Sequence, residues 1–73
     1  MMYKIDANFR QTNNKNYYYI IAHTKKEAKD KFVSYTPWLK IYSVELCDKS
    51  EELRVINNPY KYICFNRKEL KYD

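Results

Sequence analysis

The fold of this chain is decided by residues 17–27, YYYIIAHTKKE, where an apolar run passes directly into a helix start. The run from Tyr17 to His23 is aromatic and β-branched and is apolar on both faces, which predicts a strand at the centre of a sheet. Thr24 and Glu27 fit the capping box, in which the Thr hydroxyl accepts a first-turn N–H and the Glu carboxylate reaches back to the Thr N–H. A helix is therefore predicted to begin at Thr24, directly after the strand.

The predicted helix has one apolar face and one basic face. Ala28, Phe32 and Tyr35 recur at i, i+4 and i+7, the spacing of a stripe that packs on a core. Pro37 ends the helix, because proline lacks the N–H that a helix interior needs and its ring clashes with the preceding turn. A strand over residues 39–47 follows. The helix positions left in solvent carry Lys25, Lys26 and Lys29.

Strict alternation of apolar and polar side chains predicts another strand over residues 3–10, ahead of the central one. The six residues between the two strands, 11–16, are all polar and include three Asn, so they are predicted to form a hairpin loop. The first two strands are therefore expected to be neighbours in the sheet.

The C-terminal third leaves two alternatives open. Residues 53–56 are short and mainly apolar and residues 60–65 alternate, so they are predicted as the two strands of a second hairpin. A short helix from Ser50 to Ile56 is the alternative, because Asp48 is a good helix cap. The charged residues 66–73 are expected to fray.

Together these elements predict one small α+β domain over residues 1–73, in the order β-β-α-β-β-β. A chain of 73 residues has room for one thin core only. The sheet is expected to be antiparallel or mixed, with a single helix packed on one face. Because that helix cannot cover Tyr17, Tyr19 and Ile21 on the other face, the chain is predicted to form a homodimer.

The composition excludes several classes of chemistry. The chain contains no Gly, which the usual phosphate-binding loops and dinucleotide fingerprints need where the backbone meets the anion. A structural zinc site needs four ligands at suitable spacing, and the chain has one His and two Cys that lie far apart in sequence. Neither His23 with a Cys nor Asp6 with Glu45 lies in a catalytic motif. The chain is therefore predicted not to be an enzyme and to hold no metal or cofactor.

The lengths of the apolar runs and the number of cysteines indicate the cellular compartment of the protein. The longest apolar run, Tyr17 to Ala22, is far shorter than the roughly 20 residues that cross a bilayer. Polar residues break the N-terminus too early for a signal peptide. No membrane association and a cytoplasmic location are therefore expected. In that reducing compartment Cys47 and Cys64 are predicted to be buried free thiols, and a bridge between them is the alternative.

An excess of basic charge raises the hypothesis of nucleic-acid binding. The chain has 14 Lys and Arg against 9 Asp and Glu, a net charge of +5. Such a surface attracts a phosphate backbone, and aromatic side chains beside the cations can stack on bases. No RNP, KH or helix-turn-helix signature accompanies these residues. This hypothesis uses the Lys-rich helix and a Tyr-rich sheet, with the binding residues Lys15, Tyr17, Lys25, Lys26, Lys29, Tyr60 and Tyr62.

Protein binding is the competing hypothesis. Nine Tyr and one Trp give more aromatic surface than one helix can cover, and these residue types dominate the energetics of protein interfaces. Trp38 has a simpler alternative role, because directly after Pro37 it is placed to fix the end of the helix onto the sheet. Both hypotheses describe a binding protein.

In size and composition the whole chain resembles a known group of proteins. Asn, Lys, Tyr, Ile and Phe are abundant and Gly is absent, the usage of a gene rich in A and T. The chain resembles the short early proteins of phages that infect Gram-positive bacteria, and within them it is most similar to the sliding-clamp inhibitors of Twort-like staphylococcal phages. The resemblance implies a non-enzymatic inhibitor that binds a host replication or transcription protein, first of all the sliding clamp, in the host cytoplasm.

One local feature bears on the clamp hypothesis. Gln11 followed by Tyr17 and Tyr18 has the Gln and paired-aromatic spacing of clamp-binding peptides. Asn14, however, stands where those peptides carry an aliphatic anchor, and a hairpin loop does not wind into the short helical turn that they use. The clamp hypothesis therefore rests on the whole-chain resemblance.

Overall fold

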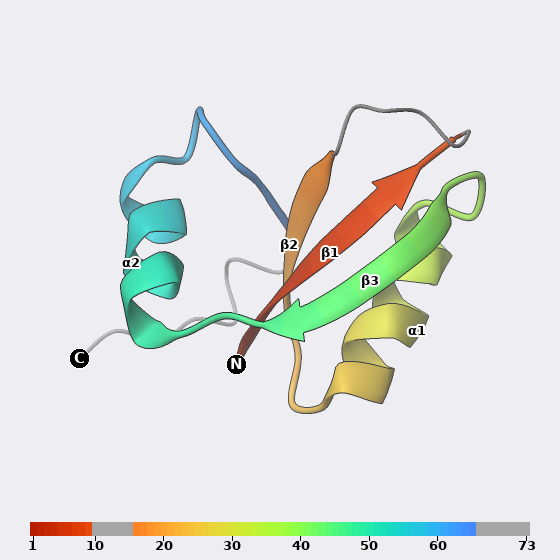
Figure 1. Ribbon diagram of the computed structural model, residues 1–73, viewed down its shortest axis with the longest axis horizontal. Coiled ribbons are helices and arrows are strands. Elements are labelled where there is room, and N and C mark those ends of the chain that lie inside the picture. Colours follow the sequence, from red (N-terminus) through yellow and green to blue (C-terminus); the bar gives the residue numbers. More distant parts are fainter. Residues whose placement is uncertain (10–15, 66–73) are drawn as a thin grey trace.

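A computed structural model describes residues 1–9 and 16–65, which form a four-stranded sheet with a helix on each face (Figure 1). The strand order is β3-β1-β2-β4; β1 is antiparallel to both β2 and β3, and β2 is parallel to β4. The predicted α+β class and the central place of the second strand are confirmed. The elements are β1 (Met2–Asn8), β2 (Tyr17–Ile21), α1 (Lys25–Tyr35), β3 (Lys40–Leu46), α2 (Lys49–Asn57) and β4 (Ile63–Phe65).

The predicted pairing of the first two strands is confirmed. Tyr3 lies opposite Ile20 in the antiparallel ladder, and the side chains of Tyr3, Ile5 and Ala7 are buried, as the alternation in β1 requires. Phe9 departs from this pattern. Because β1 ends one residue earlier, the Phe9 side chain leaves the sheet and is 66% exposed.

Helix α1 begins where the capping signal predicted. The Thr24 hydroxyl accepts the Glu27 N–H at 3.1 Å, and the Glu27 carboxylate accepts the His23 N–H at 3.0 Å, one residue before the N–H that the capping box predicted. Phe32 is fully buried against the rings of Tyr18 and Phe65, with centroid distances of 5.3 and 5.8 Å. The apolar stripe therefore anchors α1 to the sheet.

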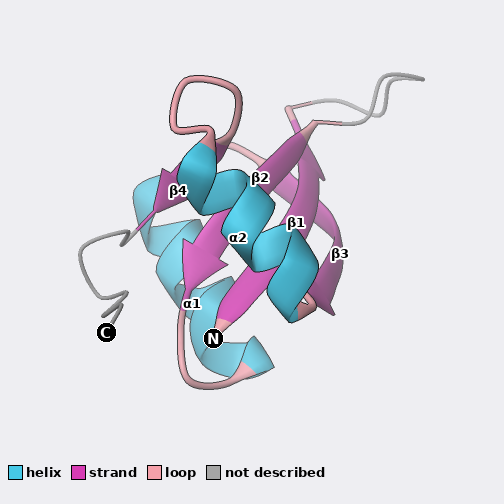
Figure 2. Cartoon of the chain, turned by 90° about the vertical axis from the view of Figure 1, so that its left-hand side faces the viewer, coloured by secondary structure: helices cyan, strands magenta, loops and turns pink. Residues whose placement is uncertain are grey.

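Residues 49–57 form a second helix, so the predicted strand over residues 53–56 and the second hairpin are wrong, and the alternative helix is correct. The Asp48 carboxylate caps this helix by accepting the Glu51 N–H at 2.7 Å. Val55 is fully buried against the end of the sheet that carries Met2, Tyr19 and Ile21. Figure 2 shows α2 in front of the sheet and α1 behind it. Burial of that apolar end is what favours the helix.

This second helix corrects the premise of the predicted homodimer. Tyr19 and Ile21, which were expected to need a second copy, are only 3% and 4% exposed because α2 covers them. Tyr17 remains 40% exposed. The homodimer stays a prediction, but an uncovered apolar sheet face no longer supports it.

The pairing of the last strand and the role of Trp38 differ from the predictions. Strand β4 lies within the predicted range 60–65, but it pairs in parallel with β2, so that Phe65 lies opposite Ile20. Trp38 is 62% exposed and does not fix the helix end onto the sheet. Residues 66–73, which were expected to fray, lie outside the described residues.

Candidate functional site

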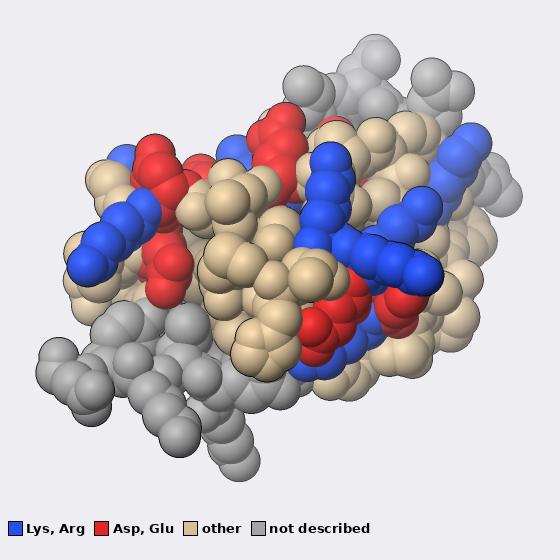
Figure 3. Space-filling view, turned by 90° about the horizontal axis from the view of Figure 1, so that it is seen from below, with Lys and Arg blue, Asp and Glu red and all other residues tan. Residues whose placement is uncertain are grey.

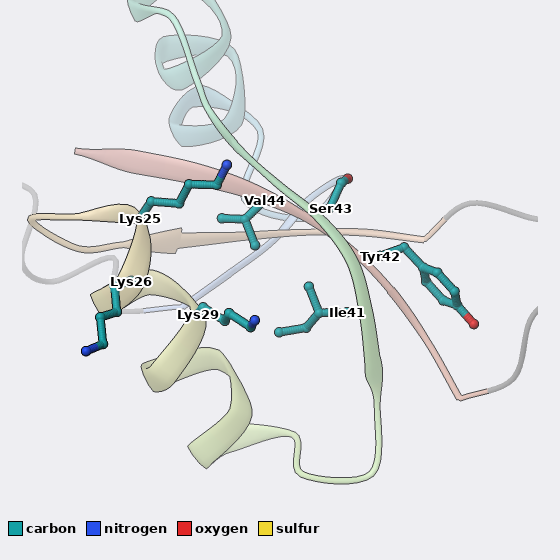
Figure 4. A pocket seen from close by; sticks show the side chains of 7 residues that line it. All are labelled: Lys25, Lys26, Lys29, Ile41, Tyr42, Ser43 and Val44. Atoms are coloured by element: carbon teal, nitrogen blue, oxygen red, sulfur yellow. The ribbon is translucent and has the colours of Figure 1, made fainter.

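A groove of about 510 Å³ runs between the first turns of α1 and the middle of β3 (Figure 4). Helix α1 supplies one wall, which is basic, and β3 supplies the other, which is mostly apolar with the hydroxyls of Tyr42 and Ser43. Figure 4 shows Lys25 and Lys29 reaching toward Val44 and Ile41, whereas Lys26 points away from β3. The lining residues are Lys25, Lys26, Lys29, Ile41, Tyr42, Ser43 and Val44.

The lysines of the groove keep their charge available. Lys25 and Lys29 are four residues apart, so they lie on the same side of α1. Among the residues that the structure describes, no carboxylate forms an ion pair with either one. Glu27, the acidic residue between them, is bound to Lys31 at 3.0 Å and to the His23 N–H. The hydrogen bond from Lys31 lowers the pKa of Glu27.

Basic side chains gather on one part of the surface in the space-filling view (Figure 3). Figure 3 shows long basic side chains gathered over the part of the molecule that contains α1, with acidic side chains beside them. The basic residues project outward, and the tan surface next to them belongs to uncharged residues. The groove therefore combines positive charge with apolar contact area.

The β3 wall is the outer edge of the sheet. Cys47 N–H donates to Met2 C=O at 2.9 Å, and because antiparallel pairing alternates, Glu45 and Ser43 also face β1. The N–H and C=O groups of Val44 and Leu46 therefore point away from the sheet. In the described part of the chain no strand pairs with this edge.

A bulge interrupts the same strand. The register of β3 against β1 shifts between Asp6 and Ala7, which leaves Tyr42 as an extra residue on the β3 side. Tyr42 is 40% exposed and carries Lys40 Nζ at 5.6 Å from its ring centroid. From Ser43 to Leu46 the pairing is regular again. This four-residue stretch is the open edge.

Three of the predicted binding residues, Lys25, Lys26 and Lys29, come together in this groove. Tyr17 and Tyr18 do not join them. Tyr17 lies on the α2 side of the sheet with Lys4 Nζ at 4.1 Å from its ring centroid, whereas Tyr18 packs on the α1 side in the core. Adjacent strand residues face opposite ways, so these two rings cannot present the paired aromatic surface of a clamp-binding peptide. Gln11 and Lys15 lie outside the described residues.

Tyr60 and Tyr62 lie near the opposite edge of the sheet. Tyr60 is fully exposed in the turn that follows α2, and Tyr62 packs edge-on against Tyr19 with a centroid distance of 5.5 Å. Since β4 and β3 are the two outer strands, these tyrosines and the lysines of α1 do not form one surface. The structure therefore does not join the aromatic and the basic parts of the nucleic-acid hypothesis.

Sequence reasoning missed the β3 half of the groove. Its apolar alternation predicted a strand but not an edge, because strand order depends on pairings that lie far apart in sequence. A usable signal was present in Lys40 and Glu45, since charged side chains are common on edge strands.

The thiols are free, as predicted. Cys47 is buried, and burial raises the pKa of its thiol to about 12. At neutral pH Cys47 is therefore a protonated and unreactive thiol. Cys64 is half-buried, so the prediction that both thiols are fully buried is only partly correct. In residues 1–9 and 16–65 there is no cluster of three or more side chains able to hold a metal ion.

Comparison with family models, curated proteins and solved structures gave no match to this chain. No helix in the described ranges is both long and apolar enough to cross a bilayer. Functional inference therefore rests on the geometry and charge of the groove.

Proposed function

We propose that the protein is a non-enzymatic inhibitor that binds an acidic surface of a host replication or transcription protein, with the DNA polymerase sliding clamp as the first candidate. The groove between α1 and β3 is the observation that carries this proposal. Its lysines are not neutralised by described carboxylates, and its other wall offers apolar area and open backbone groups. These are the components of a surface for an acidic protein partner.

Net charge favours association with an acidic partner, and exposed apolar side chains can stabilise the complex that forms. A net charge of +5 steers the protein toward an acidic partner and raises the rate of association. Two further apolar side chains are exposed: Leu46 on the same strand is 59% exposed, and Trp38, two residues before β3, is 62% exposed. Aromatic and aliphatic groups of this kind give an interface its affinity.

Nucleic-acid binding by the same lysines is the second candidate. The observation in its favour is the cluster of Lys25, Lys26 and Lys29 on one helix. The open sheet that base stacking would use is partly closed, because α2 buries Tyr19. Such binding would rely on phosphate contacts and would weaken steeply with salt.

The experiment compares two double charge reversals of equal size. Lys25→Glu with Lys29→Glu changes the groove, whereas Lys49→Glu with Lys61→Glu changes exposed lysines elsewhere. Each protein is immobilised and exposed to purified host sliding clamp, and in parallel to host lysate, at moderate salt. Reversal in the groove is expected to weaken clamp binding at least about tenfold, and the control is expected to bind like wild type.

Three results would count against the proposal. Equal loss in both double variants would show that only net charge matters and that the groove is not the site. Retention of nucleic acid without a stoichiometric host protein would favour the second candidate. Retention of a different acidic replication protein would contradict the clamp as the target but keep the proposed class of function.

A further inference from the structure

We infer that the partner enters this groove as an extended acidic segment that adds a strand to the outer edge of β3. This inference rests on the proposed function and specifies how the partner is held. Backbone hydrogen bonds along β3 would give the segment its position, and acidic side chains on every second residue would lie over Lys25 and Lys29. The result is a five-stranded sheet across the two proteins.

The first argument for strand addition is that backbone groups of β3 are open to hydrogen bonding. Val44 and Leu46 direct their N–H and C=O groups outward, because the pairs formed by Ser43 and Glu45 face β1. These two residues are separated by about 6.8 Å along the strand. An extended chain alongside can therefore satisfy both N–H and both C=O groups. Neither a helix nor a phosphate backbone carries donors and acceptors in that repeat.

The spacing of the lysines provides the second step. Paired residues share a face, so a partner residue opposite Val44 directs its side chain toward α1, and the next partner residue on that face lies beside Ile41, past the bulge. Lys25 and Lys29 are about 6 Å apart along the helix axis, close to the repeat of every second residue in a strand. A carboxylate opposite Val44 can therefore meet Lys25, and a carboxylate on the residue that lies beside Ile41 can meet Lys29.

Charge selects an acidic segment over a second copy of this chain. If β3 paired with β3 of another copy, the basic wall of each α1 would lie beside the same edge, and like charges would meet. The bulge at Tyr42 also limits regular pairing to the stretch from Ser43 to Leu46. A short acidic strand avoids both problems.

The N-terminus of α1 does not compete for the acidic groups. The Thr24 hydroxyl already accepts the Glu27 N–H, and the Glu27 carboxylate, which accepts the His23 N–H, places negative charge at this end of the helix. Partner carboxylates are therefore directed to the lysine side chains and not to the helix end. The lysines are the anchors for the acidic residues.

A backbone-specific variant tests the inference. Leu46→Pro removes the outward N–H without removing a ladder bond to β1, and its exposed position on an edge strand tolerates proline. Leu46→Ala is the control, because it loses the same side chain and keeps the N–H. Binding of a fluorescent peptide of Glu-Val repeats is measured by anisotropy, with circular dichroism as the check of folding. Leu46→Pro is expected to bind about tenfold more weakly than Leu46→Ala.

A second measurement uses the unaltered protein, so it does not depend on the folding of any variant. In antiparallel strand addition the Glu residues of the probe face α1 and lie opposite Val44 and Leu46, and their own N–H groups bond to β3. N-methylation of the Glu residues should therefore abolish binding, whereas N-methylation of the Val residues should preserve it. Equal binding of the two methylated peptides would overturn the inference.

The outcomes separate this inference from the proposed function. If host protein is captured equally by Leu46→Pro and Leu46→Ala, strand addition is wrong and the proposed function stands. If no variant captures a host protein but the Glu-methylated peptide alone fails to bind, the edge is a strand-binding site and the proposed inhibitor function is wrong. Displacement of the probe by single-stranded DNA to the same extent in both Leu46 variants, or a dimer that excludes the probe, would overturn strand addition.

Discussion

The two helices cover opposite sides of one sheet, but they contribute differently to the core. On the α1 side Phe32 is buried within a group of aromatic rings that includes Tyr18 and Phe65. On the α2 side Val55 is the buried residue of the helix, and the rest of α2 stays half-buried or exposed. The comparison teaches that α1 joins most of the core to the basic wall of the groove, whereas α2 mainly closes one end of the sheet.

The largest expected effect is on the α1 side. Phe32→Ala removes a fully buried ring and leaves a cavity among the neighbouring rings, so the free energy of unfolding should fall by about 3–5 kcal/mol. Urea denaturation followed by circular dichroism measures it. Val33→Ala is the matched control on the exposed face of α1 and should cost under about 0.5 kcal/mol.

Truncation on the α2 side should cost less. Val55→Ala deletes a smaller buried side chain and should lower the free energy of unfolding by about 2 kcal/mol, because fewer apolar groups leave the core. The same denaturation experiment applies. If Val55→Ala lowered the free energy of unfolding as much as Phe32→Ala, the two sides would contribute equally to stability, and the proposed difference between them would be wrong.

Capping should matter about equally on the two sides. Thr24→Ala and Asp48→Ala each remove a side-chain acceptor for a first-turn N–H, and each should cost about 1 kcal/mol. Ser34→Ala is a control on a hydroxyl that bonds within α1 but caps no helix start. An unchanged denaturation midpoint in both cap variants would show that packing alone defines the helix ends.

The smallest effect on stability at neutral pH comes from shifted pKa values. These shifts should make the α2 side and the α1 side respond to pH in opposite directions. On the α2 side burial raises the pKa of Tyr19 and of Cys47 to about 12, from 10.0 and 9.0. The unfolded chain therefore loses these protons first, so stability should hold below about pH 9 and decline as pH rises above it. Tyr19→Phe and Cys47→Ala should flatten that decline.

On the α1 side the sign is opposite. The hydrogen bond from Lys31 lowers the pKa of Glu27 below 4.5, so its contribution is present above that pH and is lost as pH falls. Glu27→Gln should remove this acid dependence and leave the alkaline decline unchanged. Thermal unfolding across the pH range measures both. An alkaline decline that persists in Tyr19→Phe and Cys47→Ala would show that other groups control it.

The same contrast explains how much could be predicted from sequence. Local signals were sufficient for β1, β2 and α1, because the alternation and the capping pair lie within a few residues of each other. Helix α2 is only the alternative from sequence, because Val55 and Ile56 are β-branched and favour a strand locally, whereas the apolar end of the sheet that α2 buries comes from β1 and β2.

Long-range pairing limited the prediction of the site. Lys25 and Lys29 could be assigned to an exposed helix face from their spacing alone. Their neighbours Ile41 and Val44 could not, because the groove depends on β3 lying at the edge and on the bulge at Tyr42. The parallel pairing of β4 places Tyr60 and Tyr62 away from the lysines. Local sequence patterns could not predict this pairing either.

Amide hydrogen exchange at the β3 edge tests the central claim most directly. The N–H groups of Val44 and Leu46 face solvent, so they should exchange fast in the free protein, whereas those of Ser43 and Glu45 face β1 and should exchange slowly. Saturation with the captured partner, or with the Glu-Val peptide, should slow exchange at Val44 and Leu46 at least about tenfold, the size expected for one hydrogen bond. Unchanged exchange at both residues, with new protection around Tyr60 and Tyr62, would contradict the account.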